Sequence, residues 1–147
     1  MIANVNLDMP VITYAVKDVI AFGADRSTIG AVTKVAAEQL GLVLSPDPAP
    51  EQAIFTRSDH YRFVQQGVPA VFLSTGKIDD GGSYDGFLAN HYHKPSDQFD
   101  LPINWASGVK FVALNEAITR ALAGAPARPQ WNKGDFFGLL YNGAGAK

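Results

Sequence analysis

The chain opens with apolar and polar residues that alternate over Ile2–Leu7, which is the pattern of a strand with one buried face. Continuous apolar runs predict further strands at Val19–Phe22 and Val68–Leu73, and the latter is typical of a strand buried on both faces. A shorter strand is predicted at Leu42–Leu44. Asp8 follows the first strand directly, so its carboxylate is expected at the C-terminal end of that strand.

Apolar residues that recur every three or four positions predict helices in three regions. The first helix is expected to begin at Ser27 as its N-cap, to end near Leu40 and to stop at Gly41. A short second helix is expected from Ser58 to Val64. The side chains predicted to face the core from the first helix are Ile29, Val32, Val35, Ala36 and Leu40.

The third helix is expected from Asn104, its N-cap, to about Leu122, and it carries two neighbouring apolar stripes that predict burial on more than one side. Beyond residue 124 we expect a linker and then a tail whose large apolar residues dock on the domain before a Gly/Ala end frays. The stripes are Trp105, Val109 and Val112, and Phe111, Leu114, Ile118 and Leu122. The docking residues are Trp131, Phe136, Phe137, Leu139 and Leu140.

Strands that alternate with helices predict an α/β domain in which helices cover both faces of a largely parallel sheet, a three-layer α/β/α arrangement. We assign residues 1–124 to this domain and 125–147 to the linker and tail. The segment Ser74–Tyr92, rich in Gly, Asp and Ser, is predicted to be a long loop. In sheets of this kind, functional sites gather beyond the C-terminal ends of the strands.

Charge and composition narrow the classes of partner. The formal net charge of -2 at pH 7, without a Lys/Arg cluster, argues against nucleic acid. The chain has no cysteine, so any metal would be held by His, Asp, Glu or water. No segment approaches the roughly 18 apolar residues of a membrane span, and no targeting signal is found, so we expect no membrane partner and assign no compartment.

Two histidines and one aspartate are the leading candidates for chemistry. His93 follows the long loop and precedes Lys94-Pro95, whose fixed geometry would hold the imidazole in place. On an extended segment, His91 and His93 would share a face and could clamp a metal; the alternative is one exposed and one hydrogen-bonded histidine. Asp8 would need a cation or backbone donors if it were buried, and its alternative role is to cap the turn before Pro10.

Two other clusters are assigned structural roles. Ser58, Asp59 and His60 are neighbours in sequence and cannot form the side-by-side relay of a serine hydrolase. The three aspartates within Asp79–Asp85 lack the spacing of a calcium-binding loop, so we expect them in a solvated turn.

Three motifs in order carry a resemblance to a known family. They are Asn6-Leu-Asp-Met9, then Arg57-Ser-Asp-His-Tyr-Arg-Phe63 followed closely by Gly67-Val-Pro-Ala70, then Tyr92-His-Lys-Pro-Ser-Asp97. Together they resemble the second half of the dizinc aminopeptidases, whose superfamily also includes glutamate carboxypeptidase, glutaminyl cyclase and the transferrin receptor. The resemblance runs from Ile2 to about Asp100 and implies a zinc-peptidase-like α/β/α fold, of which the chain carries the C-terminal part.

The resemblance implies roles for five side chains. Asp8 would bind one zinc ion and His93 would bind the other. Tyr92 matches a tyrosine that stabilises the oxyanion of the tetrahedral intermediate in some members. Asp59 and Asp97 match positions whose side chains orient the metal ligands without binding the metal themselves.

Other members of that family also carry a histidine, an aspartate that bridges the two metals and an adjacent pair of glutamates, all before the strand at which this chain starts. None has a counterpart here, because Glu38, Glu51 and Glu116 are not adjacent to one another. The resemblance therefore implies a zinc-dependent aminopeptidase that hydrolyses peptide substrates, represented by a part that is inactive alone. Two zinc ions belong to the complete site, and their binding to this chain alone is expected to be weak or absent.

Two alternative functions stay open. One is a non-catalytic binding or scaffold module, as in the transferrin receptor branch. The other is a stand-alone metal-binding protein that uses Asp8, His91 and His93. In each case the strand at Ile2–Leu7 is expected to have an unpaired apolar edge, through which a dimer or larger homo-oligomer would form.

Overall fold

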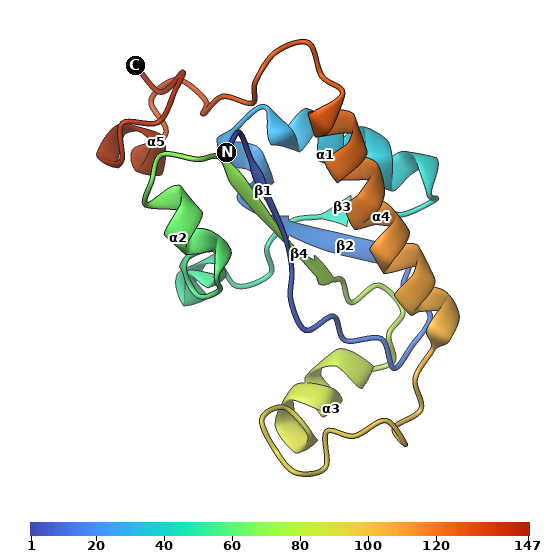
Figure 1. The fold of residues 1–147 in the computed structure, drawn as a ribbon. Helices are drawn as coiled ribbons and strands as arrows, with labels where there is room; N and C mark the ends of the chain where they lie inside the picture. The colour runs from blue at the N-terminus through green and yellow to red at the C-terminus, as the bar shows by residue number, and fades with distance from the viewer.

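The computed structural model describes all 147 residues and centres on a four-stranded sheet (Figure 1). The strands lie in the order β1-β4-β2-β3. β1 pairs with β4 and β2 pairs with β3 in parallel, whereas β2 and β4 are antiparallel. The sheet is therefore mixed, and the predicted α/β class is confirmed. The strands are β1 (Asn4–Leu7), β2 (Asp18–Phe22), β3 (Val43–Ser45) and β4 (Ala70–Thr75).

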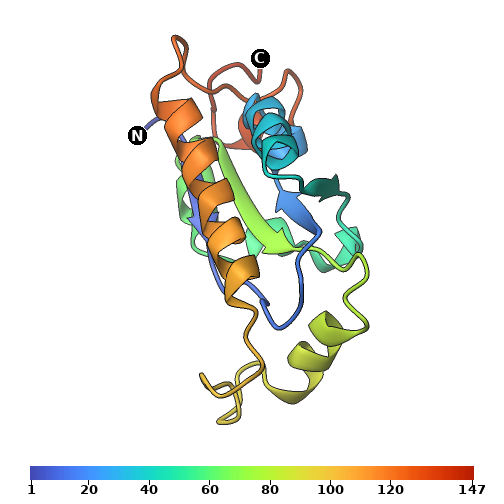
Figure 2. The same ribbon diagram turned by 90° about the vertical axis from the view of Figure 1, so that its right-hand side faces the viewer.

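Helices cover both faces of the sheet. α1 and α4 lie on one face, and α2 and α5 lie on the other, whereas α3 lies beyond one end of the sheet in a separate lobe (Figures 1 and 2). The helices are α1 (Ile29–Gln39), α2 (His60–Val64), α3 (Ser83–Asn90), α4 (Trp105–Ala123) and α5 (Phe136–Leu140). Short 3-10 turns lie at residues 24–26, 50–52 and 54–56.

Alternation of side chains along β4 divides the core in two. Val71 and Leu73 belong to the cluster formed with α1 and α4, whereas Ala70 and Phe72 belong to the cluster on the opposite face. Because the strand is buried on both faces, its sequence is apolar without interruption from Ala70 to Leu73. The two clusters are the physical basis of the three layers.

α1 differs from its prediction in its first residue and in its buried face. The helix begins at Ile29 after Thr28, and the Ser27 hydroxyl accepts a hydrogen bond from the Ile29 N–H at 3.3 Å. Val35 was predicted to be buried but is exposed, while Thr33 is buried in its place. The buried face is set by where α4 and the sheet lie, which the spacing of apolar residues does not specify.

α4 confirms its predicted N-cap and only one of its two predicted stripes. The Asn104 side chain accepts a hydrogen bond from the Ser107 N–H at 3.0 Å. The stripe that includes Phe111 and Leu114 is fully buried. The stripe of Trp105, Val109 and Val112 is exposed, so the prediction of burial on a second side is wrong. β1 ends the sheet, and no element of this chain lies outside α4 to cover that stripe.

The segment Ser74–Tyr92 is not the long loop that was predicted, because it contains the end of β4 and the whole of α3. Two of its glycines form the turn that precedes the helix: Gly81 and Gly82 have φ values of 62° and 81°, which a residue with a side chain adopts only with strain. Tyr84 and Phe87 then pack one side of α3 against the first core cluster. The glycines before α3 therefore led to the prediction of a loop where the structure has a short helix.

The tail packs on the second core cluster through Trp131. The Trp131 indole is buried, and its Nε1–H donates to the Gly67 carbonyl at 2.9 Å. Ala146 is also buried, so the expected fraying of the Gly/Ala end is wrong. Phe136, Leu139 and Leu140 are exposed and do not dock as predicted. None of the helices combines the length and apolar content that crossing a membrane requires.

His60 is a fully buried titratable side chain between two aromatic rings. Its ring stacks on Phe72 with centroids 5.3 Å apart and lies 5.2 Å from the ring of Phe55. Nε2 lies 2.6 Å from the Phe55 carbonyl oxygen, so it carries the proton, and Nδ1 is buried without a partner. Burial lowers the pKa of His60 below its ordinary value of 6.5, because the charged imidazolium would lose its hydration.

We expect His60 to make the fold less stable in mild acid. Below pH 6.5 the unfolded chain binds a proton at this histidine and the native chain does not, so the unfolding free energy falls by up to about 1.4 kcal/mol per pH unit down to the native pKa. Urea unfolding between pH 5 and pH 8 measures this slope. His60→Gln should flatten it, whereas His91→Gln serves as the control; an unchanged slope in His60→Gln contradicts the assignment.

Candidate functional site

The C-terminal ends of β1 and β4 meet at one end of the sheet because the two strands are parallel. Asp8 follows the last residue of β1, and Ser74 is the next-to-last residue of β4. A cavity of about 240 Å³ opens at this end, below α3. Side chains that line it include Asp8, Phe22, Ser58, Phe72, Tyr84 and Tyr92. A larger cavity of about 670 Å³ lies beside α1 and the turns at residues 50–56, and none of the predicted site residues lines it.

Asp8 is held by a short chain of hydrogen bonds from the same side of the sheet. The Ser58 hydroxyl donates to Asp8 Oδ2 at 2.6 Å, and the Asn6 side-chain amide donates to the Ser58 hydroxyl at 3.0 Å. Asn6 and Asp8 are two residues apart on an extended strand, so their side chains leave it on the same face. Ser58, predicted as a helix cap, instead orients the exposed carboxylate of Asp8.

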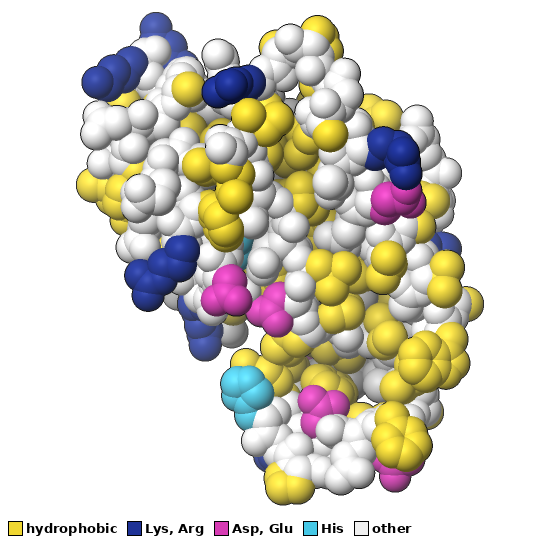
Figure 3. Space-filling model, viewed as in Figure 1, with side chains coloured by type: hydrophobic (Ala, Val, Ile, Leu, Met, Phe, Trp, Pro, Cys, Tyr) yellow, Lys and Arg dark blue, Asp and Glu magenta, His cyan; other side chains and the backbone are white.

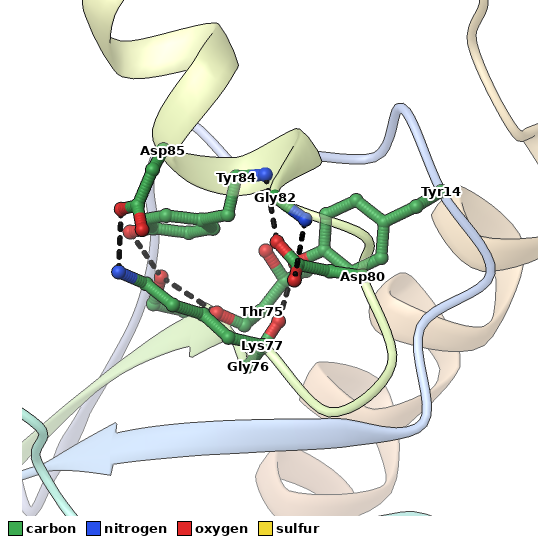
Figure 4. A network of polar contacts seen from close by, with 9 residues as sticks. Tyr14, Thr75, Gly76, Lys77, Asp80, Gly82, Tyr84 and Asp85 are labelled. Carbon is green, nitrogen blue, oxygen red and sulfur yellow. Dashed lines mark hydrogen bonds and ion pairs between the residues drawn. The ribbon is translucent and has the colours of Figure 1, made fainter.

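The α3 lobe is anchored to the end of β4 by the polar contacts in Figure 4. The Tyr84 hydroxyl lies 3.2 Å from the Ser74 hydroxyl. The Lys77 ammonium donates to Asp85 at 2.5 Å and lies 4.9 Å from the centre of the Tyr84 ring. The Asp80 carboxylate accepts from the Tyr84 N–H at 2.9 Å and so satisfies a free donor in the first turn of α3. Asp79 pairs with Lys17 at 2.7 Å, so each of the three aspartates of this segment has a partner within the chain.

Gly76, the first residue of the loop after β4, is held in place by the buried side chains of Tyr14 and Asp18. The buried Tyr14 hydroxyl donates to the Gly76 carbonyl, and burial raises the pKa of Tyr14 to about 12. Tyr14 therefore stays a neutral donor across the physiological pH range. The Asp18 carboxylate lies against Gly76 and accepts from the Ile78 N–H at 2.9 Å. These contacts fix the direction in which the chain leaves the sheet toward α3.

Tyr92 and His93 lie directly after α3. The Tyr92 N–H donates to the Phe87 carbonyl at 3.1 Å, which turns the chain back at the helix end. His93 has a left-handed φ of 55°, and its exposed ring stacks on Tyr92 with centroids 3.8 Å apart. In Figure 3 a notch separates the body from the lobe, with acidic side chains on the body and a histidine on the lobe. The structure thus brings Asp8 and Tyr92 to one cavity, and His93 stacks on Tyr92 without lining that cavity.

The histidine clamp of His91 and His93 does not form. The prediction required an extended segment, but His91 caps the end of α3 and His93 lies in a left-handed turn. His91 Nδ1 lies 3.1 Å from the Ser96 hydroxyl, so this ring forms its hydrogen bond within the lobe. The alternative of one hydrogen-bonded and one exposed histidine describes the structure.

Asp59 and Asp97 lie apart from the side chains that they were predicted to support. Asp59 is exposed at the N-cap position of α2, where its carboxylate caps no N–H. Asp97 is exposed in the turn after His93. Neither forms a hydrogen bond to Asp8 or His93, and their supporting roles stay predictions. Ser58 is the residue that supports Asp8, and no local pattern in the sequence pairs these two residues, which lie 50 positions apart.

The family model of peptidase family M28 matches residues 1–118. The chain belongs to this family. No curated protein and no solved structure matches the chain. M28 proteins are peptidases, hence hydrolases, and they generally use zinc. The match covers β1 through most of α4 and therefore includes the cavity, the α3 lobe and each of the predicted site residues.

The donor set of this M28 chain does not by itself fit a zinc ion. Zinc in proteins takes four ligands in structural sites and three protein ligands plus water in catalytic ones. Asp8 offers a carboxylate with one oxygen bound to Ser58, and the ring of His93 is exposed and is not among the residues that line the cavity beside Asp8. Nowhere in the 147 residues do three His, Asp or Glu side chains gather in a way that could hold a metal.

Replacing Gly76 with alanine should loosen the anchor of the lobe. An alanine Cβ at this position would lie 1.9 Å from Asp18 Oδ2, so either the loop or the buried carboxylate must move. We expect Gly76→Ala to lower the unfolding free energy by about 1–3 kcal/mol. The control is Gly86→Ala within α3, where a Cβ meets nothing within 4 Å and a gain of about 0.5–1 kcal/mol is expected. Urea unfolding distinguishes them, and equal stabilities contradict the packing argument.

Proposed function

We propose that this chain contributes Asp8, Tyr92 and His93 to the active site of a zinc-dependent aminopeptidase. In the proposal, Asp8 and His93 would each hold one of two zinc ions, and the remaining ligands would come from outside these residues. The peptide substrate lies in the notch between the body and the α3 lobe.

The observation that carries the proposal is the cavity of about 240 Å³ beside Asp8 and Tyr92. It lies at the C-terminal ends of two parallel strands, where α/β proteins commonly place their sites. Its volume is below the roughly 300–1,000 Å³ of pockets that enclose drug-sized ligands, so it suits one side chain of a peptide. An exposed carboxylate and a phenol on the wall of such a cavity support peptide hydrolysis as the chemistry.

Tyr92 has a defined task in this proposal. Its phenol can donate a hydrogen bond to the oxygen of the substrate carbonyl, and that bond strengthens as negative charge develops there. Ser58 keeps Asp8 in one orientation through the 2.6 Å hydrogen bond, so the carboxylate is preorganised. The chemistry that zinc supplies in hydrolases is the activation of a water molecule. The chain holds no glutamate near the cavity to take the proton from that water.

Zinc should bind weakly to the chain alone. A full structural ligand set in small peptides is worth about 10–16 kcal/mol, and Asp8 and His93 provide only one ligand to each proposed ion. Isothermal titration calorimetry at neutral pH measures the affinity. Tight binding of two zinc ions per chain contradicts this expectation and indicates further ligands, with His60 and His91 as the first to replace.

The isolated chain should not hydrolyse an amino-acid anilide, even with added zinc, because it lacks a positioned base and a bridging carboxylate. Fusion or co-expression with a segment that carries these groups should produce turnover. In the completed protein, His93→Ala is expected to lower turnover by at least roughly 10–100-fold. His91→Ala is the matched control, since this histidine lies two residues away and is bound to Ser96.

Two results of this comparison would reject the proposal. Chelator-sensitive turnover by the chain alone would show that it is a complete enzyme. Full activity of the completed protein with His93→Ala would show that His93 does not bind the metal.

A second function, that of a non-catalytic binding module, is favoured by one observation. The apolar stripe of Trp105, Val109 and Val112 is exposed on α4, which is a feature of interaction surfaces. A completed protein that folds and binds a partner but has no turnover would favour this function over the peptidase.

A further inference from the structure

The cavity of about 670 Å³ lies at the C-terminal ends of β2 and β3, next to the start of α1. β2 and β3 are parallel and α1 connects them, and ligand sites of α/β proteins gather beyond such strand ends. The volume is within the roughly 300–1,000 Å³ of sites that enclose small molecules. All the lining residues belong to the segment 21–55, and β4 lies between β2 and β1, so this cavity is independent of the open edge of the sheet.

One wall of the cavity is apolar and fixed. Phe22 and Phe55 are buried members of the second core cluster, and both line the cavity. Gly23 has a φ of 86° and packs directly on the Phe55 ring, because a Cβ at this position would lie 2.1 Å from a ring carbon. The aromatic wall is therefore held in place by the core and is available to an apolar group without rearrangement.

Arg26 is a fixed cation on this wall. Its guanidinium lies 5.3 Å from the centre of the Phe55 ring and 4.9 Å from that of Phe137, and Nη1 donates to Asp135 at 3.2 Å. A guanidinium carries five donors, and this is the only hydrogen bond that it forms within the chain. Because the Arg26 side chain is 32% exposed and lines the cavity, its other donors can bind a carboxylate in bidentate geometry.

Three more charged side chains line the cavity and are only partly engaged within the chain. Lys34 is a second cation, and its ion pair is a 4.0 Å contact with Glu38 on the same helix. The Asp25 carboxylate forms no hydrogen bond or ion pair within the chain, although its backbone carbonyl does. Asp47 uses Oδ1 alone, which accepts from the Ala49 N–H at 2.9 Å. The lining therefore offers two cations and two carboxylates to a ligand.

This balance of charge selects the class of ligand. A nucleotide or another polyanion would be repelled by the two carboxylates, and an uncharged apolar ligand would desolvate all four charges without pairing any of them. A ligand with one carboxylate and one ammonium on an apolar body can pair with groups of both signs. Its apolar part can at the same time pack on the aromatic wall.

We propose that this cavity binds a zwitterionic dipeptide with apolar side chains. The dipeptide carboxylate binds Arg26, and its ammonium binds the carboxylates of Asp25 and Asp47. The inference stands on this cavity and does not rest on the proposed peptidase activity. Phe22 and Ile54 also line the cavity beside Asp8, so a dipeptide bound here would contact side chains that the two cavities share.

NMR titration of the ¹⁵N-labelled chain tests the proposal, with the dipeptide Leu-Leu as the probe. Leu-Leu should shift the amide signals of residues 21–34 and 44–55, with a Kd on the order of 1 mM or tighter. N-acetyl-Leu-Leu lacks the ammonium, and Leu-Leu amide lacks the carboxylate. Each should bind about tenfold more weakly or worse, because it loses a charge-assisted hydrogen bond.

Two variants remove one charged contact each and keep the local structure. Arg26→Lys retains a positive charge beside Asp135 but loses the planar pair of donors, and Asp47→Asn retains the oxygen that accepts from the Ala49 N–H. Each should raise the Kd for Leu-Leu by about tenfold. Glu51→Gln is the control, since this carboxylate lies four positions from Asp47 but does not line the cavity, and it should leave the Kd unchanged.

A third variant fills the cavity from α1. Ala31 lines the cavity and is exposed, so Ala31→Phe places a ring in it without disturbing the core and should abolish the shifts. Val35→Phe is the matched control on the same helix, at a side chain that is 52% exposed and outside the cavity. The dispersion of the amide signals verifies that each variant is folded.

Four results overturn the proposal. No shift with Leu-Leu at about 10 mM, roughly ten times the expected Kd, means that the site does not exist. Equal affinities for Leu-Leu and its two blocked forms mean that the zwitterion is not recognised. Equal binding by Ala31→Phe and Val35→Phe means that the ligand lies elsewhere. Shifts confined to Asp8, Met9, Tyr84 and Tyr92 place the dipeptide in the other cavity, which rejects this inference and leaves the proposed function intact.

Discussion

The parallel pairing of β1 with β4 is the constraint on which the candidate site depends. It brings Asp8, at the end of β1, to the same end of the sheet from which the chain leaves β4 toward α3. An antiparallel pairing of the same strands would place Asp8 at the opposite end, a sheet length away from Tyr92. The cavity beside Asp8 and Tyr92 therefore follows from strand direction before any side chain contributes to it.

The α3 lobe depends on contacts with the core rather than on its surface ion pairs. The exposed ion pair of Lys77 and Asp85 contributes little to the free energy of unfolding, about 0–1 kcal/mol, because water screens the two charges. The buried hydroxyl of Tyr14 and the close approach of Gly76 to Asp18 lie deeper and fix the direction of the chain. The position of Tyr92 is thus determined about 16 residues earlier in the chain, at Gly76.

The sequence predicted those features that depend on interactions between residues close together in the chain. The strand before Asp8 and the Asn104 cap of α4 depend on neighbours in sequence, and both are present as predicted. The exposed stripe of α4 could not be predicted, since a helix with apolar residues on two sides does not reveal which side another element covers. Ser58 was missed as the partner of Asp8 because 50 residues separate them, and only the fold joins them.

The site and the open edge of the sheet share one strand, which couples them physically. Asp8 lies one residue beyond Leu7, whose backbone groups face the open edge. A strand that pairs with β1 at this edge would use the N–H and C=O groups of Val5 and Leu7. It would therefore also restrain the backbone that carries the carboxylate of Asp8.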